Sequence, residues 1–142
     1  MAFLTSTDYQ SQIKDTVLNQ IIENNNQFRL DAETKAEAQI RSRLAIRYDV
    51  TAIFAASGTN RNAEIVMVYV DMVLYHLSSR ITPGQISQTR HDRYQDALSW
   101  LDKVAEGSYR PSLPELSDAD GDGISDGNVV QWGGSTPRNP YF

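Results

Sequence analysis

The sequence contains no cysteine, which excludes a disulfide framework, a zinc ribbon and thiol catalysis, and fits a reducing compartment. It also lacks an apolar run long enough to span a bilayer, because the longest, residues 65–77, has 13 residues and includes Asp71 and His76. The amino terminus, MAFLTSTDYQ, has neither the basic start nor the apolar stretch of a secretory signal. We therefore expect a soluble protein made inside the cell, with no membrane association.

Basic residues are also scarce. Lys and Arg number 13 against 18 acidic residues, for a net charge of -5. The imbalance is concentrated at one end. Residues 115–142 hold one arginine and five acidic residues, for a net charge of -4, whereas the first 114 residues have a net charge of -1. A near-neutral body with an acidic tail does not resemble a protein that binds the phosphates of nucleic acid.

Residue groupings typical of enzymes are scarce too. The two histidines, His76 and His91, are not at metal-ligand spacing, and we expect His76 to be a core or helix-contact residue. There is no Gly-rich phosphate loop, nucleophile elbow or Ser-His-Asp ordering, and no pattern selects a catalytic pair among the 18 acidic residues. We do not expect an enzyme.

What the sequence does contain is helical periodicity. At 142 residues and 40% hydrophobic, it suits one domain with a real core. Residues 5–22 predict one helix, or two short ones broken near Lys14 and Asp15. Residues 23–28, ENNNQF, indicate a loop. A second helix is predicted from Asp31, with one apolar stripe formed by Ala32, Ala36, Ile40, Leu44 and Tyr48.

The second half of the body predicts two more helices. Residues 49–61 indicate an extended connection and not a helix. A helix after Asn62 is apolar almost all round and should be the central one. The last helix should end at Gly107, after a turn at Pro83 and Gly84, with an apolar stripe formed by Tyr94, Ala97, Leu98, Leu101 and Val104.

The predicted fold is therefore all-α. It is a small bundle of about four main helices over residues 1–110, followed by a long extended C-terminal arm over residues 111–142. The arm holds four of the five prolines and only isolated apolar residues, so it cannot form a separate domain. We expect it either to pack against the body or a neighbouring subunit, or to be mobile.

Asp71 is a charged residue flanked by apolar residues of the central helix. Burying it is costly unless it is paired. We expect Arg43 or Arg47 to pair with it, because an arginine satisfies a carboxylate with two parallel hydrogen bonds. An ion pair that fixes helix register is favoured over a functional acid.

The arm contains one motif for a specific ligand, DADGDGISDG at residues 118–127. A calcium loop of the EF-hand type takes carboxylates from its first, third and fifth positions, turns on glycine at the sixth and ends with an acid at the twelfth. The candidate Ca²⁺ ligands are Asp118, Asp120, Asp122 and Asp126. The twelfth position is Val129 and no helix is predicted on either side, so an acidic turn that does not require a cofactor is the competing interpretation.

Four segments resemble a known family. MAFLT, IRYDV, VDMVLYHL and RYQDALSWLDKVAEGS, in this order over roughly residues 1–110, are similar to the Mu-like prophage proteins related to head-tail connectors. The resemblance implies a structural phage protein of the virion neck, assembled in the host cytoplasm. Such an adaptor forms a ring, a dodecamer in that family, between the portal and the tail or stopper proteins, and DNA passes through without sequence-specific binding.

The chain departs from that family at one point, and two other functions remain open. Members often carry an aspartate-glycine loop between their first two main helices, where this chain has ENNNQF. One alternative is a calcium-binding module that uses the 118–126 loop. The other is a small helical regulator that binds nucleic acid through the segment from Lys35 to Arg47.

Overall fold

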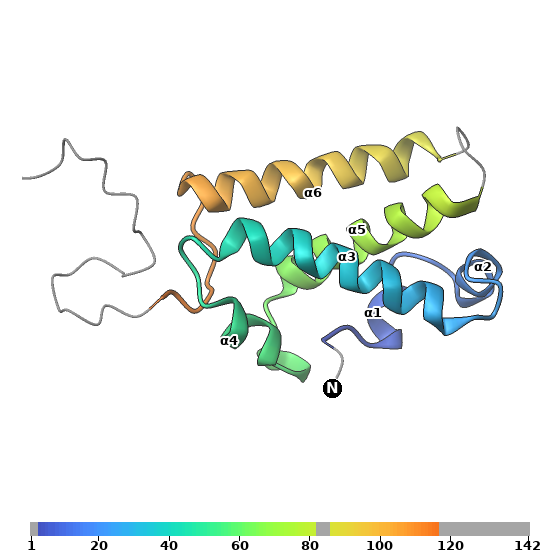
Figure 1. The fold of residues 1–142 in the computed structure, drawn as a ribbon, viewed down its shortest axis with the longest axis horizontal. Helices are drawn as coiled ribbons and strands as arrows, with labels where there is room; N and C mark the ends of the chain where they lie inside the picture. Colours follow the sequence, from blue (N-terminus) through green and yellow to red (C-terminus); the bar gives the residue numbers. More distant parts are fainter. Residues whose placement is uncertain (1–2, 82–85, 117–142) are drawn as a thin grey trace, which may run out of the picture.

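Three helices of 19 residues each form the body of the protein. The computed structural model describes residues 3–81 and 86–116. The long helices are α3 (Asn26–Leu44), α5 (Ala63–Ile81) and α6 (Gln88–Glu106). Four short elements accompany them (Figure 1), namely α1 (Ser6–Gln10), α2 (Asp15–Ile21), α4 (Val50–Ala55) and the 3-10 turn η1 (Gly58–Asn60). The all-α prediction is confirmed. Within the described ranges, no helix is long and apolar enough to cross a membrane.

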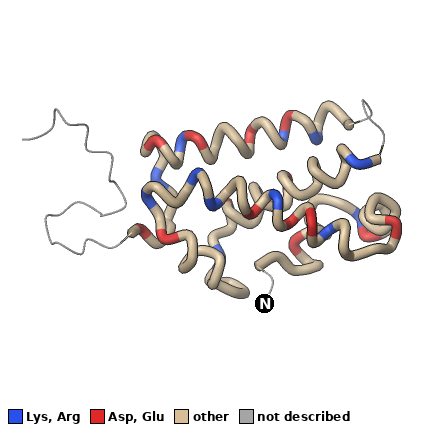
Figure 2. The backbone as a smooth tube through the Cα atoms, viewed as in Figure 1, with Lys and Arg blue, Asp and Glu red and all other residues tan. Residues whose placement is uncertain are grey.

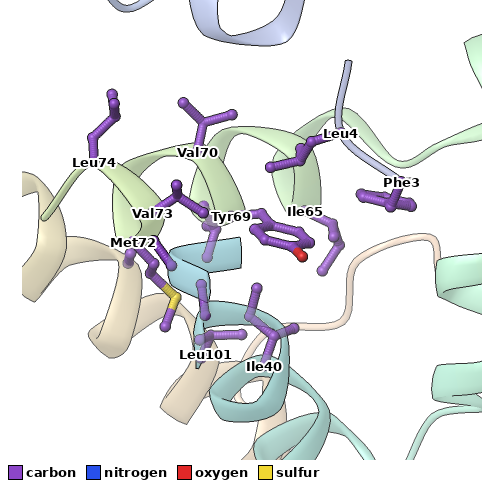
Figure 3. Packing of buried hydrophobic residues seen from close by; sticks show 14 of the residues in the cluster. Phe3, Leu4, Ile40, Ile65, Tyr69, Val70, Met72, Val73, Leu74 and Leu101 are labelled. Carbon is purple, nitrogen blue, oxygen red and sulfur yellow. The ribbon is translucent and has the colours of Figure 1, made fainter. Parts of the chain in front are cut away.

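Helix α5 is the central helix, as its sequence predicts. Both α3 and α6 pack along it, and α1 and α2 contact it as well. Ile40 of α3, Met72 of α5 and Leu101 of α6 are all fully buried, and Figure 3 shows how side chains from these helices fill the core. The predicted stripes of α3 and α6 both lie on this core. The long helices are therefore held mainly by apolar burial.

Of the two predicted arrangements, the amino-terminal region adopts the second, two short helices with the break before Asp15. Helix α1 begins after Thr5, whose backbone N–H donates to the Asp8 carboxylate in a capping box, and α2 begins after Lys14. Asp8 also accepts two hydrogen bonds from Arg61, which precedes α5. Burial raises the pKa of Asp8, but these hydrogen bonds outweigh burial and lower the pKa below its ordinary value. This ion pair fastens the amino terminus to the core.

Helix α3 begins earlier than the sequence predicts. The cap is Asn25, whose side chain accepts from the Gln27 N–H, and not Asp31, so the expectation of a loop over residues 23–28 is wrong from Asn26 onward. The turn before the cap is made by Glu23 and Asn24, whose φ values are 54° and 56°.

The segment 49–61 contains a helix, contrary to the prediction of an extended connection. The Asp49 side chain accepts from the Ala52 N–H and caps α4, which buries Ile53 and Phe54. The sequence reads as extended because the helix is only 6 residues long and is followed by Gly58 and Asn60. A short capped helix of this kind depends on tertiary burial rather than on its own periodicity.

Helix α6 ends at the predicted glycine. Gly107 has a φ of 87°, a left-handed conformation that favours glycine. The Arg47 side chain donates to the carbonyl oxygens of Ala105 (2.8 Å) and Glu106 (3.2 Å). A side chain at Gly107 would contact this guanidinium, since the position of its Cβ lies 3.0 Å from Arg47 Cζ. Arg47 therefore neutralises the carbonyl end of α6 and needs a glycine beside it.

The chain beyond α6 lies against the body as far as Leu116. The carbonyl of Pro114 accepts from the Asp49 N–H at 2.9 Å, and the Leu116 N–H donates to the carbonyl of Arg47 at 3.2 Å. We call residues 111–116 the strap. The rest of the predicted arm and the turn at 83–84 lie outside the described residues.

Candidate functional surfaces

Asp71 is buried on α5 and forms an ion pair with α6. Arg93 donates from Nε to Oδ1 at 2.8 Å and from Nη2 to Oδ2 at 3.3 Å, and Arg90 Nη1 lies 3.8 Å from Oδ1. Arg93 Nη2 also donates to Gln12 Oε1 at 3.0 Å, which ties this pair to the segment between α1 and α2. The predicted ion pair is therefore present.

The predicted partners of Asp71, however, are wrong. Arg43 instead donates to Asp102 of α6 at 3.0 Å, and Arg47 caps the end of α6. Arg43 lies in the last turn of α3 and Arg47 just beyond its end, and this region meets the carboxyl half of α6. The residues that reach Asp71 come from the first half of α6.

The ionised form of Asp71 depends on these arginines. Burial raises its pKa, hydrogen bonding and charge from Arg93 oppose this effect, and the pKa remains above its ordinary value. The same carboxylate raises the pKa of Arg93. Asp71 therefore acts as a structural link between α5 and α6, at a cost in desolvation.

A groove lies between α5 and α6 beside this ion pair. Met67, Val68, Ala97 and Trp100 provide its apolar lining, and Asp71, Arg93 and Asp96 provide its polar lining. A second hollow, on the α1 side, shares Met67 and Arg93 and is also lined by Gln12 and Val66. The two hollows form a continuous surface across α1, α5 and α6, which we call the Met67 groove.

One end of the Met67 groove is held by a carboxylate clamp. Glu64, in the first turn of α5, accepts from Trp100 Nε1 and from the Tyr109 hydroxyl, each at 2.7 Å. The two rings also meet edge to face, with centroids 6.1 Å apart. The clamp fixes the Trp100 ring in one orientation.

A second buried carboxylate, Glu33 of α3, is not predicted by the sequence. It accepts from the Tyr9 hydroxyl at 2.6 Å and lies 3.6 Å from Arg29 Nε. Burial raises the pKa of Glu33 despite both partners. The only sequence signal is its position next to the apolar stripe of α3, which brings it to the edge of the core.

The basic residues of α3 largely make contacts within the protein. Arg41 pairs with Glu37 at 2.7 Å and lies over the Phe54 ring, while Arg43 and Arg47 bind α6. Figure 2 shows both signs of charge along α3 and α6. These contacts compete with phosphate binding, so they disfavour α3 as a nucleic-acid recognition helix.

The histidines lie among aromatic side chains of α5 and α6. His76 Nε2 is 2.8 Å from Gln39 Oε1, and burial together with the charge of Lys35 lowers the pKa of His76. The His91 ring lies 6.3 Å from that of Tyr75. His76 is thus a half-buried helix-contact residue, as predicted.

The candidate calcium ligands Asp118, Asp120, Asp122 and Asp126 lie outside the described residues. Over residues 3–81 and 86–116, no group of three or more histidine or acidic residues is placed to hold a metal ion.

Comparison with protein families matches residues 2–125 to the family described as Bacteriophage Mu, Gp36. The match extends past the 1–110 region of resemblance and takes in Asp118, Asp120 and Asp122. Comparison with curated proteins and with solved structures finds no match. Because the family match covers most of the chain, this protein belongs to the Bacteriophage Mu Gp36 family.

Proposed function

We propose that this protein is a structural subunit of the phage neck, a non-catalytic adaptor that forms a ring between the portal and the tail. The family match over residues 2–125 carries this proposal, because it makes the chain a Mu-type phage protein. The head-tail connector resemblance of the four sequence segments supplies the position in the virion. The subunit would be assembled in the host cytoplasm and would contact the portal and a tail or stopper protein.

The fold suits an assembly subunit. Three long helices share one core and give a body that can keep its shape while its outer faces bury against neighbours. A closed ring uses head-to-tail contacts, so one subunit must present two different, matching surfaces. The Met67 groove is one candidate for such a surface.

Helix α6 supplies a second feature relevant to a neck ring. Its exposed charged residues are mainly acidic, since Asp92, Asp96, Asp102 and Glu106 accompany Lys103. Acidic residues facing a lumen would repel DNA phosphates and let the duplex slide without sticking. We propose this face of α6 as a lining of the channel. A neutral or basic lumen in single-particle images would remove the proposal.

The ring is tested by the oligomeric state of the purified full chain. We expect light scattering after gel filtration, together with negative-stain images, to give closed rings, either for the protein alone or after addition of the portal protein from the same phage. DNA binding measured at low and high salt is the control, and we expect none that is sequence-specific. A protein that stays monomeric and does not bind the portal protein would contradict the adaptor function.

A further inference from the structure

The Met67 groove exposes an apolar part of helix α5 beside its most deeply buried stretch. Met67 is 46% exposed, whereas its neighbour Val68 is 2% exposed and most of α5 beyond it is buried. The open strip continues onto Val66 and Trp100, which are only partly buried. An apolar strip with fixed polar groups at its edge is typical of a surface that receives another chain.

The chain itself carries a segment whose chemistry matches this groove. Residues 128–142, NVVQWGGSTPRNPYF, contain no acidic residue, unlike the aspartate-rich residues 118–127 before them. Their apolar residues are Val129, Val130, Trp132, Tyr141 and Phe142. Aromatic side chains pack well on an exposed methionine and on a tryptophan. The only charge in the segment, Arg138, is opposite in sign to Asp96 at the groove edge.

The strap contacts a different part of the body from the Met67 groove. It crosses the beginning of α4 and ends with Leu116 bound to Arg47, at the carboxyl end of α3. The groove lies instead among α1, α5 and α6. Fifteen residues lie between Leu116 and Trp132, and the sixteen steps from one to the other span at most about 55 Å when extended. That exceeds the length of a 19-residue helix, roughly 28 Å, so a neighbouring body is within reach.

We propose that residues 128–142 of one copy bind in the Met67 groove of the next copy. This inference rests on the proposed ring function and specifies one of its subunit contacts. The strap that precedes the segment contacts Arg47 and the beginning of α4, whereas the groove lies among α1, α5 and α6. A head-to-tail contact needs two such separate surfaces. The groove supplies a preformed apolar surface for the segment.

Because the chain has no cysteine, disulfide cross-linking gives a direct test. One full-length variant carries Met67→Cys and another, distinguishable by an amino-terminal tag, carries Trp132→Cys. The two are mixed under the conditions that give rings, with portal protein if rings need it, and are then mildly oxidised. Docking raises the effective concentration of the two thiols from about 10 μM to about 1 mM. We expect the mixed disulfide to form about 100-fold faster than it would between copies that are not docked to each other.

The matched control is Leu30→Cys, on α3, because Leu30 is 42% exposed, close to the value for Met67. Circular dichroism confirms that each variant is folded. A Met67→Cys mixture that cross-links no faster than the Leu30→Cys mixture would overturn the inference. So would a double variant of Met67→Cys and Trp132→Cys that closes only within single chains. Rings that form without the mixed disulfide would leave the adaptor function standing, whereas the absence of rings would count against both.

Discussion

Replacing Ile40 with alanine is expected to lower the free energy of unfolding by about 2–5 kcal/mol. Ile40 is fully buried, and it belongs to the core that joins α3, α5 and α6. Its loss removes apolar contacts and leaves a cavity that close-packed helices fill only in part. Urea denaturation at one fixed protein concentration measures the change, since a ring adds a dependence on concentration.

The matched control is Ile46→Ala, because the same residue type is 47% exposed just beyond the end of α3. We expect its free energy of unfolding to change by no more than about 0.5 kcal/mol. Equal losses for the two variants would show that burial in the three-helix core does not determine the stability of the body.

Replacing Arg93 with methionine is expected to lower the free energy of unfolding by about 2 kcal/mol at neutral pH. The variant removes two hydrogen bonds from a buried carboxylate, Asp71, and leaves Arg90 as its nearest cation at 3.8 Å. The loss should fall below that for a fully buried pair, because the Arg93 side chain is 41% exposed. Urea denaturation measured across a pH series tests it.

The sign of the pH dependence follows from the raised pKa of Asp71. A carboxyl whose pKa is higher in the folded state destabilises the fold when it is ionised, so this penalty acts above the ordinary aspartate pKa of about 4. The penalty is complete above the folded-state pKa and disappears as the pH falls from there to the ordinary pKa. Removing Arg93 enlarges this penalty. We therefore expect the difference in free energy of unfolding between the Arg93 variant and the parent to shrink as the pH falls from 7 towards 4.

Arg43→Met is the control for the Arg93 variant. Arg43 also pairs with an aspartate of α6, but this partner, Asp102, has a side chain that is 65% exposed. An exposed pair contributes less than about 1 kcal/mol and its loss should vary little over the same pH range. A pH-independent loss for the Arg93 variant would contradict the role assigned to Asp71.

The long helices could be predicted from the sequence because their apolar stripes are periodic and their ends carry recognisable residues. Asn62 and Gly107 mark the start of α5 and the end of α6 correctly. The misses are short or local. Helix α4 is too short to show helical periodicity. Asn25 is not recognisable as the cap of α3 because it lies in a polar run that also contains the preceding turn.

The candidate surfaces were less predictable than the helices. The sequence indicates that Asp71 needs a cation, but it offers several arginines on other helices as possible partners. Only the packing of α6 on α5 brings Arg93 to Asp71. The Met67 groove cannot be read from periodicity, because α5 is apolar almost all round and the open side is set by where α1 and α6 stop covering it.

The position of this protein in assembled particles tests its assignment to the phage neck most directly. Virions from the phage that encodes it can be labelled with gold-tagged antibodies against the purified protein and imaged by electron microscopy. We expect the label at the junction between head and tail, and only there. Label on the capsid shell or the distal tail, or virions that lack the protein, would contradict the proposal that it is a neck adaptor.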